Sequence, residues 1–310
     1  IPIHKVQTLS INGKSVNAVV RDTIHALDQV SITGQVTSQS DELLSGFNGK
    51  VFVKVFDKLN DIQTLANDPG SRKTTFKSQK NLIFTGSATV KNGLFSINFV
   101  VPKDINYAFG QGKISYYATD EDSEDASGFY TDFIVGGTNP DGVVDNEPPT
   151  VEVFMNDVNF VLGGVTSKDP ILLVKLSDNL GINVAGSSIG HDLTAVLDQN
   201  SNNVYALNDF YEAKIDDFTQ GTVRFPLFDL ESGRHEIKIR AWDVANNSAE
   251  GYTEFIVAES QSVALEQVLN YPNPFTTNTQ FMFEHNLPRQ LLDVQVRIFT
   301  VSGKLVKSLN

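Results

Sequence analysis

The stretch "HEIKIRAWDVANNSAEGYTEFIV" (residues 235–257) contains two runs in which apolar and polar residues alternate. A short segment rich in Asn and Ala separates them. Alternation with a period of two places the apolar side chains on one face of a β-strand. The stretch therefore predicts two strands joined by a short turn, each with one face in a core.

The same pattern extends outward from this stretch over residues 151–258. Seven apolar runs separated by short turns occur there: "VEVFM", "ILLVKLSD", "DLTAVLD", "NVYALNDFYEA", "TVRFPLFDL", "HEIKIRAWD" and "YTEFIV". This number and spacing of strands is typical of an immunoglobulin-like β-sandwich, although the cysteine pair of antibody domains is missing. Trp242, the single tryptophan, falls within a strand and is predicted to pack between the sheets.

The N-terminal part of the chain shows short alternating runs as well. Examples are "VFVKVFD" (51–57), "LFSINFVV" (94–101), "KISYYATD" (113–120) and "YTDFIV" (130–135). Asn92-Gly93 supplies the positive φ angles of a tight hairpin turn. "GGTNPDGVVDNEPPT" (136–150) is rich in Gly, Pro and Asp and has no apolar period. We predict a β-sandwich of meander or Greek-key type at 1–138, a linker at 139–150 and the immunoglobulin-like sandwich at 151–258.

The last part of the chain opens on "NYPNPFTTNTQFMFEHN" (270–286), which is typical of a rigid proline bend that leads into a strand. "DVQVRIFTV" and "GKLVKSLN" follow, with Ser302-Gly303 as a hairpin turn. So few strands cannot bury a two-sided core. We expect residues 259–310 to be a partial third sandwich that is truncated. The predicted fold class is all-β, with tandem β-sandwiches.

Composition narrows the classes of function. The net charge of −13 argues against nucleic acid and anionic membrane surfaces as partners, because both require positive fields. The cysteine count of zero excludes disulfides, thiolate metal sites and a cysteine nucleophile within this chain. No apolar run is long enough to span a membrane, and the chain begins at Ile1 without a signal pattern. We expect the sequence to be a piece of a longer protein.

Two groups of acidic residues outside the immunoglobulin-like unit are candidates for calcium. In the loop "TDEDSEDASG" (119–128) the candidate ligands are Asp120, Asp122 and Asp125. Asp125 stands where an EF-hand loop needs glycine, so the pattern favours a solvated turn. The linker acids Asp141, Asp145 and Glu147 could hold a cation that stiffens the junction between domains. A polar hinge is the simpler interpretation of the linker.

A further candidate site lies in the loops of the immunoglobulin-like unit, because strand ends cluster at the ends of a sandwich. The residues expected to meet there are Asp178, His191, Asp192, Asp243 and Asn246. Asp side chains in such loops accept hydrogen bonds from the loop backbone. We predict hydrogen-bonded loop caps first and a calcium site second. His191 alone, without a second His or a Cys, does not indicate zinc.

Hydrolase chemistry finds little support in the sequence. Paired carboxylates can always be found among 37 acids, and only their separation across a cleft would indicate glycoside hydrolysis. No G-x-S-x-G elbow on a strand-to-helix turn appears in the sequence for a serine nucleophile. The 21 phenylalanines alternate within strands and are predicted to form cores.

The C-terminal motif resembles the sorting domains carried by cargo of the Bacteroidetes type IX secretion system. The matching residues are Tyr271, Pro272, Asn273, Pro274 and Phe275, followed by "TQFMFEHN" and by the Gly303-Lys304 turn of "VRIFTVSGKLV". Those sorting domains also open on a proline-asparagine-proline bend and close on a strand, a Gly-Lys or Gly-Arg turn and another strand. The resemblance covers about 45 residues and implies that residues 259–310 direct the protein to the cell surface.

Most of the remaining chain resembles the region downstream of the catalytic domain in the gingipain-like sortases of the same system. The likeness rests on "LSGFNGKVFVKVFDK", "VVPKDINYAFGQGKISYYATD", "FIVGGTNPDG", "GINVAGSSIGHDLTAVLD", "LNDFY" and "RAWDVANNSA". In that family an upstream Cys/His peptidase domain removes sorting domains from cargo and attaches the cargo to surface lipopolysaccharide. The resemblance implies that this chain is non-catalytic and supports that peptidase.

The resemblance also implies partners and a location. The partners are the upstream peptidase domain of the same chain, a PorV-like outer-membrane β-barrel and secreted cargo proteins, and nucleic acid is not among them. The location is the cell surface in association with the outer membrane, after export through the periplasm. An alternative is the stalk of a surface adhesin or a polysaccharide-degrading enzyme secreted by the same route.

Overall fold

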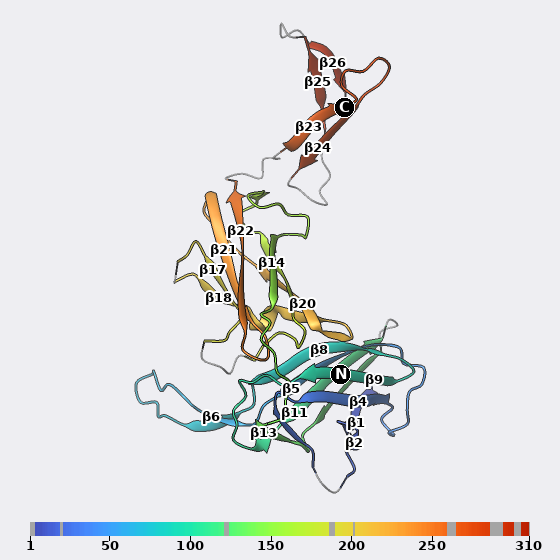
Figure 1. Cartoon of the computed structure of the whole chain (residues 1–310), viewed down its shortest axis with the longest axis vertical. Coiled ribbons are helices and arrows are strands. Elements are labelled where there is room, and N and C mark those ends of the chain that lie inside the picture. Colours follow the sequence, from blue (N-terminus) through green and yellow to red (C-terminus); the bar gives the residue numbers. More distant parts are fainter. Residues whose placement is uncertain are drawn as a thin grey trace.

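The computed structural model describes residues 4–18, 21–120, 124–185, 190–200, 202–258, 265–285, 294–300 and 305–309. Strands dominate these residues, and their one helical turn is a 3-10 turn, Asn208–Phe210. The prediction of an all-β fold is therefore confirmed. None of the described residues belongs to a helix with the length and hydrophobicity that crossing a bilayer requires. The strands form three units in a row, called units 1, 2 and 3 in chain order (Figure 1).

Unit 1 is a large sheet that curls around a core. Its main sheet has the order β8-β5-β11-β12-β1-β4-β9, with β2 beside β1, and its outer strands β8 and β9 also touch. A small sheet, β10-β13-β3, and an arm formed by β6 and β7 complete the unit. The strands are β1 (His4–Ile11), β2 (Lys14–Ser15), β3 (Thr23–Ala26), β4 (Gln29–Thr37), β5 (Gly49–Phe56), β6 (Asn60–Gln63), β7 (Thr75–Ser78), β8 (Leu82–Val90), β9 (Leu94–Val100), β10 (Gly110–Gln111), β11 (Lys113–Asp120), β12 (Asp125–Tyr130) and β13 (Ile134–Thr138).

The alternation seen in the sequence explains how unit 1 is built. In β5, Val51, Val53 and Val55 are fully buried, whereas the residues between them face outward. Asn92 and Gly93 both have positive φ angles, 52° and 75°, at the turn between β8 and β9. This turn confirms the predicted hairpin.

The first strand of unit 1 is held by an unusually close backbone approach. β1 pairs in parallel with β12, with His4 opposite Ala126 and Lys5 opposite Ser127. A β-carbon on Gly128 would lie 1.9 Å from the carbonyl oxygen of Val6. Only glycine fits at this position, because any side chain would collide with the backbone of β1.

Unit 2 has the strand order of an immunoglobulin-like sandwich. One sheet has the order β14-β16-β20-β19 and the other β15-β22-β21-β17-β18, which correspond to A-B-E-D and A′-G-F-C-C′. Its strands are β14 (Thr150–Met155), β15 (Val165–Thr166), β16 (Ile171–Ser177), β17 (Thr194–Leu197), β18 (Val204–Ala206), β19 (Tyr211–Lys214), β20 (Asp217–Pro226), β21 (Gly233–Trp242) and β22 (Ser248–Val257). The quoted stretch 235–257 forms the long hairpin β21–β22.

The predicted position of Trp242 is wrong. In β21 the inward positions are taken by Ile237, Ile239 and Ala241, all fully buried. Because side chains alternate along a strand, Trp242 lies on the outer face. There it packs against the ring of His191 at the end of the unit that meets unit 1.

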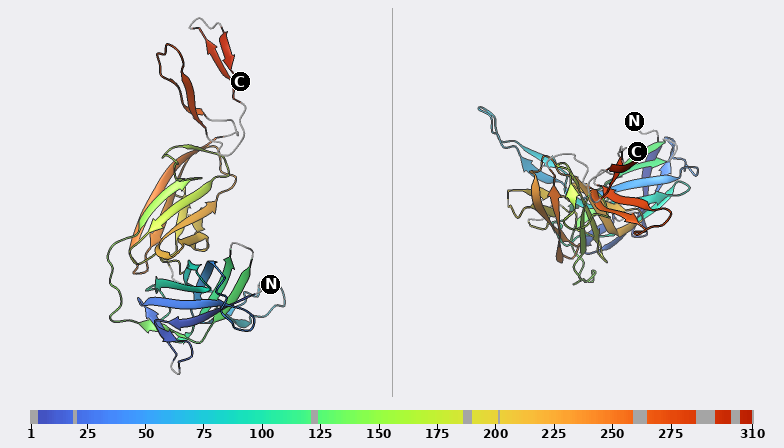
Figure 2. Two further views of the ribbon diagram at one scale, coloured as in Figure 1. Left: turned by 90° about the vertical axis from the view of Figure 1, so that its right-hand side faces the viewer. Right: turned by 90° about the horizontal axis from the view of Figure 1, so that it is seen from above.

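Unit 3 consists of two hairpins. They are formed by β23 (Leu265–Tyr271) with β24 (Gln280–His285), and by β25 (Val296–Phe299) with β26 (Leu305–Leu309). Figure 1 and the left view of Figure 2 show these hairpins at the end of the molecule that is remote from unit 1. No described residue beyond Val257 is buried, and many apolar side chains of these hairpins are exposed. The predicted turn at Ser302-Gly303 lies outside the described residues.

Candidate functional site between the first two units

Units 1 and 2 are joined by a carboxylate from unit 1 that reaches into the loops of unit 2. Asp104 lies in the loop that follows β9. Its Oδ1 accepts a hydrogen bond from Asn246 Nδ2 (2.7 Å), and its Oδ2 accepts one from Asn183 Nδ2 (3.2 Å). His191 Nδ1 lies 2.6 Å from the same Oδ2. One side chain therefore connects three residues in two loops of the neighbouring unit, the β16–β17 loop and the β21–β22 loop.

The three loop residues are held in place by their own surroundings. Asn183 is fully buried, and its Oδ1 accepts a hydrogen bond from the backbone N–H of Ala185 (2.9 Å). The ring of Trp242 contacts the ring of His191, at 4.1 Å between centroids, and the guanidinium of Arg240, which lies 4.9 Å from the indole centroid. Arg240 over an indole face is a cation–π contact. The donors that face Asp104 are thus positioned by the fold of unit 2.

A second contact between the units is made by the turn between β19 and β20. Asp216 Oδ1 accepts a hydrogen bond from the backbone N–H of Thr89 (2.7 Å), and Oδ2 accepts one from its hydroxyl (2.6 Å). The backbone N–H of Asp216 donates to the carbonyl of Ser87 (3.0 Å). Phe218 packs against the core of unit 1, and Leu82 packs against the core of unit 2. These contacts join the units at two places rather than by the linker alone.

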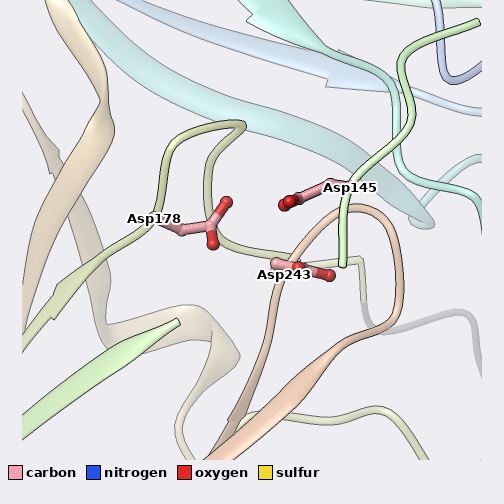
Figure 3. Close-up of side chains that lie close together, drawn as sticks. All are labelled: Asp145, Asp178 and Asp243. Atoms are coloured by element: carbon pink, nitrogen blue, oxygen red, sulfur yellow. The ribbon is translucent and has the colours of Figure 1, made fainter. Parts of the chain in front are cut away.

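Three carboxylates gather beside this junction. Asp145 comes from the linker, Asp178 from the loop after β16 and Asp243 from the loop after β21 (Figure 3). One oxygen from each lies within 4.8 Å of the other two. Figure 3 shows Asp145 and Asp178 pointing toward each other with Asp243 beside them. This set combines one linker acid with two of the loop acids that the sequence singled out.

Two of these carboxylates cap their own loops, as predicted. Asp178 Oδ1 accepts hydrogen bonds from the N–H groups of Leu180 (2.8 Å) and Gly181 (3.0 Å). Asp243 Oδ1 accepts from the N–H groups of Ala245 (2.9 Å) and Asn247 (2.7 Å). Asp and Asn commonly stabilise turns in this way. The local sequence thus fixes where both carboxylates lie.

The surroundings of the cluster favour the protonated forms of Asp178 and Asp243. Burial raises the pKa of Asp178 to about 6, and the charges of Asp243 and Asp145 act in the same direction. Burial also raises the pKa of Asp243, although hydrogen bonds from Asn247 and Ala245 oppose the shift. Asp145 Oδ2 is buried and has no hydrogen-bond partner. Hard oxygen donors in this arrangement suit calcium as well as a proton.

The remaining predicted ligands lie elsewhere. The carboxylate group does not include Asp192, and Asn246 bonds to Asp104 instead. In the acidic loop of unit 1, Asp120 Oδ1 accepts from the N–H of Glu124 (2.7 Å), and Asp125 Oδ1 accepts from the hydroxyl of Tyr117 (2.9 Å). Asp122 lies outside the described residues.

The C-terminal motif is only partly described. Tyr271 ends β23, and Pro272, Asn273, Pro274 and Phe275 follow in the connection to β24. Tyr271 is 68% exposed and Phe275 is 53% exposed. Gly303 and Lys304 lie outside the described residues.

Asp104 was not foreseen from the sequence. It sits in "VVPKDINYA", where nothing in the spacing distinguishes it from other surface acids. Its importance depends on which loops of another unit lie opposite, and a single sequence carries no signal for that.

The chain is similar to several solved structures, among them a type IX secretion protein. The chain is 33% identical over its whole length to a part of the dimeric latent PorU from Porphyromonas gingivalis, with a TM-score of 0.50. The 310-residue chain therefore spans 29% of the length of the PorU chain in that structure. No family model matches the sequence, and no protein of curated function does so either.

Two other solved structures are similar at a much lower level. The fibronectin(III)-like modules of Clostridium thermocellum CbhA are 13% identical, with 81% of this chain and 93% of theirs covered and a TM-score of 0.22. The C-terminal domain of the Streptococcus agalactiae AgI/II polypeptide BspA is 12% identical, with 82% and 100% covered and a TM-score of 0.22. Similarity at this level says nothing about function.

Proposed function

From its similarity to one part of PorU over its whole length, we propose that this chain is the non-catalytic C-terminal region of a gingipain-like type IX secretion sortase. The 33% identity across all three units is the observation that carries the proposal. The parent protein would cleave sorting signals from cargo and attach the cargo to the cell surface. The chain has no cysteine, so the nucleophile of a cysteine peptidase would belong to another part of the parent.

Units 1 and 2 act as a support that orients the peptidase. Two rigid sandwiches are useful for this purpose only if they keep a fixed relation to each other. The Asp104 network and the Asp216 turn supply such a connection, and each joins residues that are far apart in the sequence. This role needs no ligand or reacting group in the chain itself.

Unit 3 docks the protein on an outer-membrane partner, a PorV-like β-barrel. Its hairpins expose large apolar side chains, among them Val268 (67%), Phe299 (54%) and Val306 (63%). Exposed apolar residues that gather in one part of a protein commonly mark interaction sites. The strand edges of the two hairpins also offer backbone groups for pairing with another chain. The parent would therefore lie at the cell surface, where it meets its cargo.

Complementation tests this proposal. Cells that lack the parent gene receive either the intact gene or one that lacks residues 4–309 of this chain. We expect the shortened protein, although it keeps the peptidase, to leave cargo unprocessed and poorly attached to the surface. Normal cargo processing by the shortened protein would contradict the proposal.

The stalk of a secreted adhesin or polysaccharide-degrading enzyme remains the second candidate. The arrangement of three units in a row also suits a spacer (Figure 1). In a stalk of cargo, the C-terminal unit would be cleaved off near residues 258–265 on secretion. A sortase would keep this unit, so the C-terminus of the mature protein, determined by mass spectrometry, separates the two candidates.

A further inference from the structure

Unit 1 presents an exposed aromatic surface on the outer face of its main sheet. It consists of Phe52 on β5, Tyr117 on β11 and Phe129 on β12, which we call the aromatic patch. These side chains are 46%, 43% and 71% exposed. The rings of Phe52 and Tyr117 stack at 6.3 Å between centroids with an interplanar angle of 27°. These side chains are not part of the core, because the residues next to them in β5 and β11 point inward.

Contacts within the sheet hold the rings of the aromatic patch in place. Phe52 and Tyr117 lie directly opposite each other in the antiparallel pair of β5 and β11. The hydroxyl of Tyr117 donates a hydrogen bond to Asp125 Oδ1 (2.9 Å), which fixes the ring on the sheet. Clustered aromatic residues of limited rotational freedom are characteristic of the centres of protein interfaces.

Positive charge flanks the aromatic patch. Lys50 and Lys54 precede and follow Phe52 by two residues, so they lie on the same face of β5. Both are exposed, and neither ammonium group forms an ion pair with any described residue. The chain as a whole is strongly acidic, so two lysines without acidic partners favour a partner whose rim carries carboxylates.

The patch continues the interface between units 1 and 2. In the register of β5 and β8, Phe52 lies opposite Ser87. The carbonyl of Ser87 accepts the hydrogen bond from Asp216 of unit 2. The contact with unit 2 therefore reaches to within one strand of Phe52. A partner on the patch would border both units.

The patch also lies beside the start of the chain. Lys5, Ser127, Tyr117 and Phe52 stand in one row across β1, β12, β11 and β5. Adjacent strands are about 4.8 Å apart, so Tyr117 lies about 10 Å and Phe52 about 14 Å from the backbone of Lys5. Any polypeptide that precedes His4 emerges within reach of the patch.

We propose that the aromatic patch is the surface on which the preceding part of the parent protein docks, through an apolar centre rimmed by acidic side chains. This inference rests on the proposed function, in which the peptidase precedes this chain. Docking there would fix the peptidase against units 1 and 2 together. The docking part and this chain would belong to one polypeptide, so the contact is intramolecular and a patch of modest size suffices.

Hydroxyl-radical footprinting with mass spectrometry tests the docking surface. The labelling rates of Phe52, Tyr117 and Phe129 are compared in the full-length parent and in the 310-residue chain. We expect rates at least about fivefold lower in the parent, since the centre of an interface excludes water. Phe228 (70% exposed) and Tyr252 (58% exposed), both in unit 2, serve as internal references whose rates stay unchanged. Equal labelling of the patch in both proteins would overturn the proposal.

Charge variants of the parent provide a second test of the docking surface. Lys50→Glu combined with Lys54→Glu should restore labelling of the aromatic residues, whereas Lys91→Glu, at another exposed lysine of unit 1, should not. Protection that appears in the 310-residue chain as its concentration rises would identify a second copy as the occupant and overturn the proposal. The sortase assignment is judged by cargo processing instead, so either conclusion can fail alone.

Discussion

The carboxylate of Asp104 in unit 1 lies 2.6 Å from Nδ1 of His191 in unit 2. This contact and the two amide hydrogen bonds to the same carboxylate connect loops that are 79 to 142 residues away along the chain. A spacer needs only that its units remain linked, but a support for another domain needs a fixed angle between them. The junction is therefore the feature on which the proposed role depends.

Asp104→Ala should loosen the junction. The substitution leaves the amides of Asn183 and Asn246 without their acceptor, and an unpaired buried donor costs about 1–3 kcal/mol. We expect the melting midpoint of unit 2, followed by the fluorescence of Trp242, to fall. Small-angle scattering should show a broader range of molecular shapes. Asp68→Ala, at an exposed acid of unit 1, is the control, and an equal effect of both substitutions would contradict the account.

The stability of unit 2 should depend on pH through Asp178. Its pKa is 3.8 in the unfolded chain and about 6 in the folded protein. As the pH rises from about 4 to 6, the unfolded chain loses this proton while the folded protein keeps it, so the free energy of unfolding falls. The loss approaches roughly 3 kcal/mol at most and is complete above the folded pKa.

Asp178→Asn tests this pH dependence. The amide oxygen can still cap Leu180 and Gly181, but the buried charge is gone. Urea unfolding monitored by Trp242 fluorescence should show a flatter pH profile between pH 4 and 6 and greater stability than the wild type at pH 7. A profile that remains as steep as that of the wild type would assign the pH dependence to other groups.

Calcium should compete with protons for the three-carboxylate cluster. At pH 8, where Asp178 is ionised, we expect millimolar calcium to raise the melting midpoint of unit 2 relative to chelator, because a ligand that binds only the folded state stabilises it. At pH 5 and in Asp178→Asn the difference should shrink. An unchanged melting midpoint at pH 8 would show that calcium does not bind the three-carboxylate cluster.

Gly128→Ala should destabilise unit 1. The new β-carbon would lie 1.9 Å from the carbonyl oxygen of Val6 and would force β1 away from β12. We expect a loss of at least about 2 kcal/mol in the free energy of unfolding, since overpacking against rigid backbone cannot be relieved by rotamer changes. Gly46→Ala, which meets no atom within 4 Å, is the matched control. Similar denaturation midpoints for both variants would contradict the close approach.

The sequence was sufficient for the fold class because the relevant signals are local. Alternation identified β5 and the β21–β22 hairpin, and Asn92-Gly93 identified the turn between β8 and β9, since each signal depends only on neighbouring residues. The Asp178 and Asp243 caps were predictable for the same reason. Trp242 was misplaced because its phase within the strand, rather than its hydrophobicity, decides which face it occupies.

The junction could not be predicted from the sequence to the same degree. Asp145 and Asp243 each belong to a recognisable loop, but only the packing of the linker against unit 2 brings them within 4.8 Å. Asp104 meets His191 across 87 residues, and one sequence carries no signal for such a contact. Long-range pairing between units is set by surface shape, which local patterns do not encode.

Sequencing the parent gene on the side that precedes Ile1 tests the central claim most directly. The account predicts a caspase-like domain that carries a Cys and a His, encoded in frame with this chain. Repeats of similar sandwiches, or a domain that cleaves polysaccharides, would contradict it and would identify the chain as a stalk of secreted cargo.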